Sequence, residues 1–386
     1  MRSAIRIGTA LFFCVGSFVS PGQTPPAATA APAQVPSASG QNDRDLTSRS
    51  PSPDTSPLGN DSRIDTSKIN LDVVVSDKSG RHIPGLALTD FTVLDNNQPV
   101  KILSFHAYEA TAQQPRPPVE AIILFDTVNT TFDAVSYTRQ QVENFLRANG
   151  GHLPLPVLLA WVTNDGIEAQ SEPSVDGNAL AAQLDTAEGR LRSITRSAGA
   201  YGAIERFQLS TRLLDQLART EVGKPGRKLL IWAGPGWPML DGPNINLAGK
   251  AQRQIFGEIV ELSTLMRVGH ITLYSVTEGM PGPETFLYQS FVKGVKKAQQ
   301  AGIPNLGLKV LAAQSGGLVI PPTNDLAGSV KECLQDSDSF YSLSFETPPA
   351  DGPNQYHELK VRLDKPGLTA RTATGYYDQP PQQAAP

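Results

Sequence analysis

From residue 119 onward, short continuous apolar runs alternate with longer segments in which apolar residues recur every three or four positions. Continuous runs are typical of strands buried on both faces of a sheet, and the three-to-four spacing is typical of amphipathic helices. The pattern predicts strands at residues 119–126, 155–165, 227–234 and 270–278, and helices at residues 135–149, 202–220 and 248–269. This order predicts an α/β fold with a doubly wound, mostly parallel sheet.

The chain on either side of this region alternates apolar and polar residues with period two, which is typical of strands with one buried face. Such stretches fill residues 69–108 and 339–377, where turn residues such as those of "KSGR" and "NNQ" separate the strands. A few strands with one apolar face need a second layer to cover that face. The sequence therefore predicts a small antiparallel β unit built from both ends of the chain, with the α/β region inserted between them.

The first twenty residues have the pattern of a secretory signal peptide. Arg2 and Arg6 precede an apolar stretch, Ile7 to Val19, that is short for a membrane-spanning helix. We expect cleavage between about residues 20 and 30, and an exported protein located in the periplasm, at the cell surface or outside the cell. Retention of the segment as a membrane anchor is one alternative, and lipid attachment at Cys14 is another, although phenylalanines precede that cysteine.

Composition completes the expected organisation, because stretches rich in Pro, Ala, Ser and Gln cannot bury enough apolar surface to fold. The expected parts are a signal peptide at 1–20, a disordered spacer at 21–66, an N-terminal β segment at 67–110, an α/β domain at 118–338, a C-terminal β segment at 339–378 and a disordered tail at 379–386.

Net charge and cysteine content limit the classes of ligand and the covalent cross-links that the sequence allows. The net charge of −4 provides no attraction to nucleic acid or to anionic lipid. Removal of the signal peptide would leave Cys333 as the only cysteine, so that no internal disulfide could form. Val330 and Leu334 share a helical face with Cys333, which predicts a buried and unreactive thiol.

Catalytic signatures are missing from the sequence. It contains no G-x-S-x-G, no G-x-x-x-x-G-K, no G-x-G-x-x-G and no pair of histidines at ligand spacing, and its five histidines are scattered. We therefore expect a protein that is not an enzyme. The alternative is a hydrolase or transferase whose site is assembled across loops.

Four pieces of the sequence together resemble the von Willebrand factor A-related proteins typical of acidobacteria. They are "FDTVNT" after the first predicted strand, "GRKLLIWAGPGWP", the leading "VVVSDKSGRHIPGLALTDFTVLDNNQPVKILSF" and the trailing "ARTATGYYD". The resemblance covers roughly residues 67–378 and implies a Rossmann-like domain of von Willebrand A type. It also implies a metal-dependent adhesion site, formed by a D-x-S-x-S motif, a later threonine and an aspartate after the fourth strand, at which a partner's acidic residue completes the shell of the ion.

This sequence departs from that ligand pattern. Asp126 matches the leading carboxylate and Thr130 keeps a hydroxyl, but Val128 offers no side-chain oxygen, and Ala233 and Gly234 stand where the aspartate is expected. A divalent ion needs about six oxygen ligands, so we expect the metal site at Asp126 and Thr130 to be degenerate, and to hold Mg²⁺ or Ca²⁺ weakly or not at all.

Several alternatives remain for this region. Thr195 is the nearest candidate for the later threonine, and Asp165 and Asp241 are possible substitute carboxylates. Replacing Val128 with serine and Gly234 with aspartate is the change expected to restore a metal shell. In the other interpretation, Asp126 accepts hydrogen bonds from backbone amides at the start of the following helix.

The loop "AGPGWPMLDGP" follows the strand predicted at residues 227–234 and contains Trp237. Trp237 is either an exposed anchor for a partner or a side chain that folds back onto the sheet. The sequence as a whole favours a non-catalytic binding or adhesion module that engages a protein or cell-surface ligand through Asp126, Thr130, Trp237 and Asp241. A structural component of an envelope complex is the alternative.

Overall fold

The computed structural model describes residues 68–109, 118–162, 166–186, 199–240, 249–348 and 352–378. Its central sheet has the strand order β10-β9-β5-β6-β7, and β8 pairs with β6. The first four strands in this order are mutually parallel, whereas β7 and β8 run antiparallel to β6. The strands are β5 (Val119–Phe125), β6 (His152–Val162), β7 (Ile167–Ala169), β8 (Ser174–Asp176), β9 (Arg227–Ala233) and β10 (Ile271–Val276).

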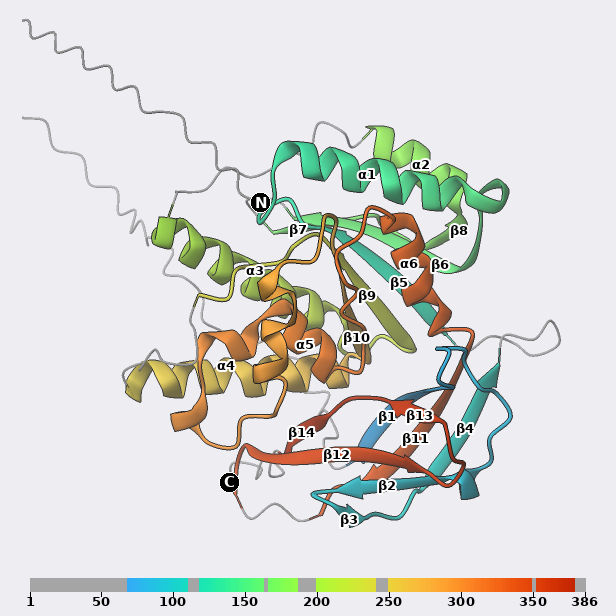
Figure 1. Ribbon diagram of the computed structural model, residues 1–386, viewed down its shortest axis with the longest axis vertical. Helices are drawn as coiled ribbons and strands as arrows, with labels where there is room; N and C mark the ends of the chain where they lie inside the picture. The colour runs from blue at the N-terminus through green and yellow to red at the C-terminus, as the bar shows by residue number, and fades with distance from the viewer. Residues whose placement is uncertain are drawn as a thin grey trace, which may run out of the picture. The chain divides into compact units, whose positions relative to one another are not determined.

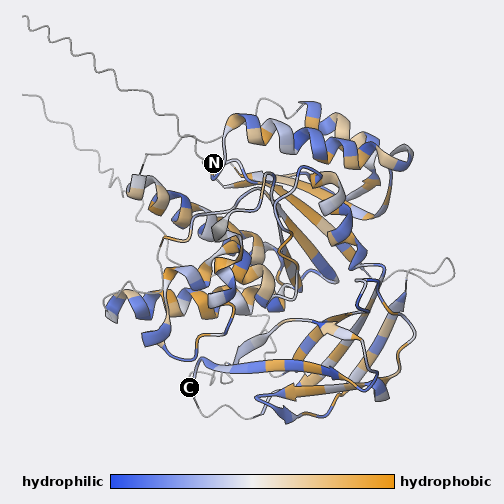
Figure 2. Ribbon diagram, in the orientation of Figure 1, coloured by the Kyte–Doolittle hydropathy of each residue, from blue (hydrophilic) through white to orange (hydrophobic). Residues whose placement is uncertain are grey.

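Helices cover both faces of this sheet (Figure 1). One apolar cluster joins the sheet to α1, α2 and α6, and a second joins it to α3, α4 and α5. The strands between these helices are strongly hydrophobic in Figure 2, as the continuous apolar runs predict. The helices are α1 (Phe132–Arg147), α2 (Gly177–Thr186), α3 (Gly199–Glu221), α4 (Gly249–Val268), α5 (Leu308–Gln314) and α6 (Leu326–Gln335).

Short 3₁₀ helices fill several of the connections. They are η1 (Leu88–Asp90), η2 (Ala148–Gly151), η3 (Pro283–Phe291), η4 (Ala298–Gln300) and η5 (Ile303–Leu306). Within the described part of the chain, none of the helices combines the length and the apolar character that crossing a bilayer requires.

The remaining strands form two four-stranded antiparallel sheets, ordered β13-β1-β11-β4 and β14-β12-β2-β3. Each sheet pairs strands from opposite ends of the chain, as β1 pairs with β11 and β2 with β12. A shared apolar cluster with residues from both sheets holds them together. The strands are β1 (Lys68–Ser76), β2 (Phe91–Asp95), β3 (Gln98–Pro99), β4 (Ser104–Glu109), β11 (Ser339–Glu346), β12 (Gln355–Leu363), β13 (Thr369–Arg371) and β14 (Gly375–Asp378).

These observations confirm the predicted fold class: a mostly parallel α/β sheet with antiparallel strands contributed by both ends of the chain. The structure differs in dividing those strands between two sheets. The chain crosses between the two sheets several times. One crossing falls between β13 and β14, where the Thr374 amide donates to the Gln314 carbonyl at 3.0 Å and Arg371 donates to the Gly316 carbonyl. These bonds to the segment at the end of α5 draw the chain out of the first sheet and return it in the second.

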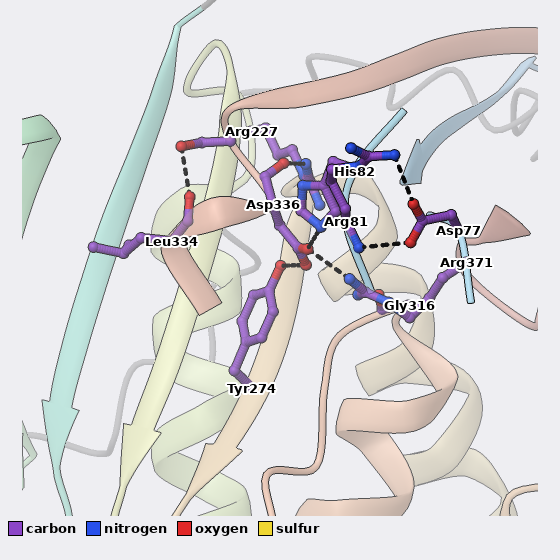
Figure 3. A network of polar contacts seen from close by, with 10 residues as sticks. Asp77, Arg81, His82, Arg227, Tyr274, Gly316, Leu334, Asp336 and Arg371 are labelled. Carbon is purple, nitrogen blue, oxygen red and sulfur yellow. Dashed lines mark hydrogen bonds and ion pairs between the residues drawn. The ribbon is translucent and has the colours of Figure 1, made fainter. Parts of the chain in front are cut away.

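A polar network centred on Asp336 joins the antiparallel sheets to the α/β body (Figure 3). The fully buried carboxylate accepts from the Tyr274 hydroxyl at 2.5 Å and from Arg371 Nη2 at 2.6 Å, and His82 Nε2 lies 3.4 Å away. Arg227, the first residue of β9, donates to the Asp336 backbone carbonyl at 2.9 Å. The antiparallel sheets thus contact the side of the body where β9 begins, and the carboxyl edge of the parallel sheet lies at the other end of its strands.

Cys333 lies on α6 and is fully buried. Burial raises the pKa of its thiol well above the usual value, with a further contribution from the negative charge of Asp336. The thiolate is therefore disfavoured near neutral pH, and the predicted burial of the thiol is confirmed.

Candidate functional site at the carboxyl edge of the sheet

The strand order places a topological switch point between β5 and β9. The chain leaves β5 for β6 on one side and returns later to β9 on the other, so the loops that follow β5 and β9 diverge from each other. In doubly wound sheets, this is where ligands bind, outside the carboxyl ends of the strands. Phe125 pairs with Ala233, and the Asp126 amide donates to the Ala233 carbonyl at 3.0 Å. Asp126 therefore stands at the switch point.

The Asp126 carboxylate is buried, with 3% of the residue exposed, and donors surround it. Oδ1 accepts from the backbone amides of Val128 at 3.1 Å and Asn129 at 2.9 Å. Oδ2 accepts from the Trp232 indole at 2.9 Å and from the Gly236 amide at 3.0 Å. The Asn129 side-chain amide reaches both oxygens, at 3.0 and 3.1 Å.

Six hydrogen bonds therefore replace the hydration that this carboxylate loses on burial. Asp126 does accept hydrogen bonds from backbone amides, as one interpretation of the sequence expects. These amides belong to the loop before α1 and not to the start of that helix, whose N-cap is Thr131. The network also links the loop after β5 to the loop after β9, because Val128 and Asn129 belong to the first loop and Gly236 to the second. Asp126 therefore links the two diverging loops through hydrogen bonds to one carboxylate.

The other positions of the expected metal motif are placed differently. Val128 is buried in the apolar cluster beneath α3 and α4, and Thr130 is partly exposed just before the α1 N-cap, Thr131. Among the residues that the structure describes, no three His, Cys, Asp or Glu side chains are grouped as a metal site. The substitute candidates Thr195, Asp165 and Asp241 lie outside the described residues.

Gly234 corrects one expectation from the sequence. Its φ is +150°, and a Cβ added there would lie 2.4 Å from the Asp126 Cβ. An aspartate at position 234 is thus excluded by contact with Asp126 itself. The change of Val128 to serine with Gly234 to aspartate, expected to restore a metal shell, would disrupt the loop instead.

Trp237 is not an exposed anchor, since only 4% of it is accessible. Its indole donates to the Leu306 carbonyl at 2.9 Å, and its ring meets Trp232 edge-on at 5.2 Å between centroids. Of the two alternatives for this residue, the structure shows the one in which the side chain folds back onto the sheet. The loop following β9 is therefore fixed from inside by two tryptophans.

The sequence does not single out the exposed apolar side chains on segments that start at this edge. Nine large apolar residues are exposed in the described part of the chain, and six of them lie on segments that start at the carboxyl edge. These six are Phe132 (58% exposed) at the start of α1, Tyr201 (82%) and Ile204 (43%) at the start of α3, and Met280 (86%), Phe286 (56%) and Leu287 (41%) after β10.

One sequence signal would have found part of this surface. A large apolar residue in a segment rich in glycine and proline drew attention to Trp237, and the same description fits Met280 in "EGMPGP". Trp237 has an indole N–H that finds a buried acceptor, whereas the unbranched Met280 side chain stays in solvent. The pattern identifies both loops, but only packing decides which side chain faces outward.

A histidine and a carboxylate also meet inside the antiparallel sheets. His357 Nδ1 lies 2.8 Å from Asp95 Oδ1, and the Tyr376 hydroxyl donates to Asp95 Oδ2 at 2.7 Å. His357 and Asp95 are 5% and 4% exposed, so a substrate has no direct access to them. This pair, which is distant in sequence, is a buried polar cluster of the β core and lies away from the carboxyl edge.

No protein-family model and no curated protein sequence matches this chain. Among solved structures, the human COPII-coat protein Sec24c matches with a TM-score of 0.34 and 8% identity, over 71% of this chain and 46% of that one. The manganese-loaded TRAP protein of Plasmodium vivax matches with a TM-score of 0.30 and 9% identity, over 70% and 97%. The pilus adhesin SpaC of Lactobacillus rhamnosus GG matches with a TM-score of 0.30 and 10% identity, over 78% and 49%. The fold rests on the strand order of this chain and not on these distant similarities.

Proposed function

We propose that this protein is a non-catalytic binding module that engages a protein or cell-surface ligand at the carboxyl edge of its central sheet. The observation that carries the proposal is the distribution of exposed apolar residues, of which six in nine lie on segments starting at that edge. Exposed apolar surface of this kind is typical of interaction sites, and a switch point is where doubly wound sheets bind.

The contacts at this edge would be made by apolar side chains and not through a shared metal ion. The Asp126 oxygens already accept six hydrogen bonds, and Val128 contributes no oxygen. A ligand would instead meet rigid aromatic and flexible thioether groups such as Phe132, Tyr201 and Met280, residue types that suit protein surfaces.

Export is part of the same proposal and rests on the sequence of residues 1–20, which lie outside the described residues. A ligand at the cell surface requires the module to leave the cytoplasm. N-terminal sequencing of the native protein tests this, and we expect a mature chain that begins near residue 20 to 30. Recovery of an intact Met1 from the cytoplasmic fraction would contradict export while leaving the binding surface untested.

The binding surface is tested by affinity capture from envelope and culture fractions of the source cells. The wild-type chain is compared with a Phe132→Ser, Met280→Ser variant, and with a Leu88→Ser, Leu103→Ser variant as the matched control. Leu88 and Leu103 are also exposed, at 43% and 47%, but lie in the antiparallel part of the molecule. We expect the edge variant to lose its partners and the control to keep them. Equal capture by all three proteins would refute the proposed surface.

A further inference from the structure

A second candidate site lies at the opposite side of the α/β body, where the antiparallel sheets meet it. A crevice there encloses about 70 Å³ between α4, the start of β10, the end of α5 and the chain from Thr372 to Gly375. One water needs roughly 10–15 Å³ of such space, so the crevice has room for a small chemical group but not for a large ligand. Seams between structural layers are common positions for ligand pockets.

Arg267 of α4 lines this crevice and supplies its permanent charge. Within the described residues its guanidinium makes no hydrogen bond or ion pair, and its Nε is buried without a partner. Burial lowers the pKa of the guanidinium, and the negative charge of the nearby Asp378 carboxylate offsets this only in part. Asp378 is close enough to act on this charge, but the described residues give the guanidinium no direct ion pair. A buried cation without a hydrogen-bonded counter-ion destabilises the folded chain, so packing alone gives no reason for an arginine here.

A second donor without a partner lines the same crevice. The Thr372 hydroxyl is buried and makes no hydrogen bond. Three other polar side chains of the lining are already used. Gln314 donates to the Val292 carbonyl at 3.1 Å, Tyr356 donates to the Thr374 carbonyl at 3.2 Å, and Ser315 donates to the Ala312 carbonyl at 3.0 Å. The buried groups of the crevice that lack a partner in the described part of the chain are therefore a cation and a hydroxyl, and both can donate hydrogen bonds.

The remaining charges nearby are consistent with this description. Asp72, the acidic residue of the lining, lies 3.6 Å from the buried Arg227 Nε, so its charge already has a counter-ion. Burial lowers the pKa of His270, which also lines the crevice, and its ring is thus neutral near pH 7. Met266 and Leu311 add apolar walls. The buried polar atoms of the lining that lack a partner among the described residues are thus Arg267 Nε and the Thr372 hydroxyl, and Asn70, Ser263 and Thr272 add further polar groups to the wall.

We propose that this crevice binds a carboxylate group, with Arg267 as its charge partner and Thr372 as an additional donor. A carboxylate fits the small volume, presents only acceptors, and matches the planar donor fork of a guanidinium. The carboxylate belongs either to a small free acid or to the C-terminus of a peptide. This site is separate from the proposed surface at the carboxyl edge, and either can exist without the other.

Calorimetry and thermal unfolding of the full chain test the proposal with sodium acetate as the probe, against sodium chloride at equal ionic strength. The test variants are Arg267→Met and Thr372→Val. The control is Arg253→Met, at an exposed position on the same helix as Arg267. We expect acetate to raise the unfolding midpoint of the wild type and of the control. The dissociation constant should rise by about tenfold or more in the Arg267→Met variant, because the charge-assisted pair is lost.

The ligand-free Arg267→Met protein separates a binding role from a structural one. If Arg267 serves to bind a ligand, it has no partner within the protein. Its replacement should then leave the midpoint of thermal unfolding without acetate unchanged, or raise it. A fall of the midpoint together with no acetate effect in the wild type would overturn the proposal. The two sources of the carboxylate are distinguished by the tripeptide Gly-Gly-Ala with a free or an amidated C-terminus. Binding of the free form alone indicates a peptide terminus, binding of acetate alone indicates a small acid, and equal binding of both peptides refutes carboxylate recognition.

Discussion

At the scale of single residues, the hydrogen-bond partners of Asp126 determine the geometry of the candidate site. Asp126 is the residue that the sequence singles out, and the structure keeps it at the switch point but surrounds it with donors from two loops and a strand. The partners that matter, Trp232, Gly236 and Asn129, have no signature in sequence as carboxylate donors. Their role follows from the approach of β9 to β5, which only the fold determines.

Replacing Asp126 with asparagine tests this role. The substitution removes the charge and turns an NH₂ group toward donors that previously had an acceptor, so we expect a loss of about 3 kcal/mol or more in the free energy of unfolding. Urea denaturation measures the loss. The control is Asp133→Asn, in the exposed first turn of α1, where the change should stay within about 1 kcal/mol. A loss below about 1 kcal/mol for Asp126→Asn would mean that its hydrogen bonds do not hold the loops together.

Metal affinity is a separate prediction at the same residue. A divalent ion would have to displace donors from Asp126 while gaining few other protein oxygens, since Val128 and Gly234 supply none from their side chains. We expect magnesium, calcium and manganese to bind no more tightly than roughly millimolar in calorimetry. Micromolar binding by the unmodified protein, abolished by Asp126→Ala in a chain that remains folded, would contradict this and revive a metal-dependent adhesion mechanism.

At the scale of elements, periodicity predicts those that are buried in a regular way. The strands β5, β6, β9 and β10 and the helices α1, α3 and α4 lie where apolar runs and three-to-four spacing place them. Short elements such as β7, β8 and α5 carry too few residues to display a period. The sequence also does not predict the division of the antiparallel strands into two sheets, because that division depends on pairings such as β1 with β11 and β2 with β12, which are far apart in sequence.

One contact between elements gives a prediction about pH. Tyr274 of β10 donates to Asp336, which follows α6, and burial together with this carboxylate raises the pKa of the phenol well above its usual value. Below about pH 10 the phenol is protonated in both the folded and the unfolded chain, and its stabilising contact is fully present. Above that pH only the unfolded chain loses the proton, so the folded state loses stability as pH rises.

The Tyr274→Phe variant isolates this effect. At neutral pH its free energy of unfolding should be lower than that of the wild type by about 1.5–3 kcal/mol, because the hydrogen bond to Asp336 is lost. Between pH 10 and 11, the stability of both proteins should fall. The slope should be shallower for the variant, and the difference between the two slopes should be about 1.4 kcal/mol per pH unit. Urea unfolding at pH 8, 10 and 11 provides the comparison. Tyr201→Phe is the control because Tyr201 is 82% exposed. Parallel pH profiles for wild type and Tyr274→Phe would show that Tyr274 ionises freely in the folded protein.

At the scale of the whole molecule, the two ends of the chain complete a structure that neither forms alone. β11 lies between β1 and β4, and β12 lies between β2 and β14. The C-terminal strands β11, β12 and β13 therefore each pair with an N-terminal strand. The apolar cluster between the sheets contains Ile69 and Val93 from one end and Tyr341 and Leu359 from the other. Folding of the antiparallel sheets therefore waits for the last part of the chain.

Truncation before Phe340 should consequently expose the apolar faces of β1 and β2 and leave β4 without a partner. We expect the shortened chain to aggregate or to be cleaved rapidly by proteases, because unpaired strand edges and exposed apolar surface promote both. A chain that ends at Asp378 retains every described strand and serves as the control. Size-exclusion chromatography and hydrogen exchange compare the two proteins. If the chain truncated before Phe340 stays monomeric, with unchanged exchange from Leu71 to Phe105, then the N-terminal strands are stable without their C-terminal partners, and the dependence of one end on the other is refuted.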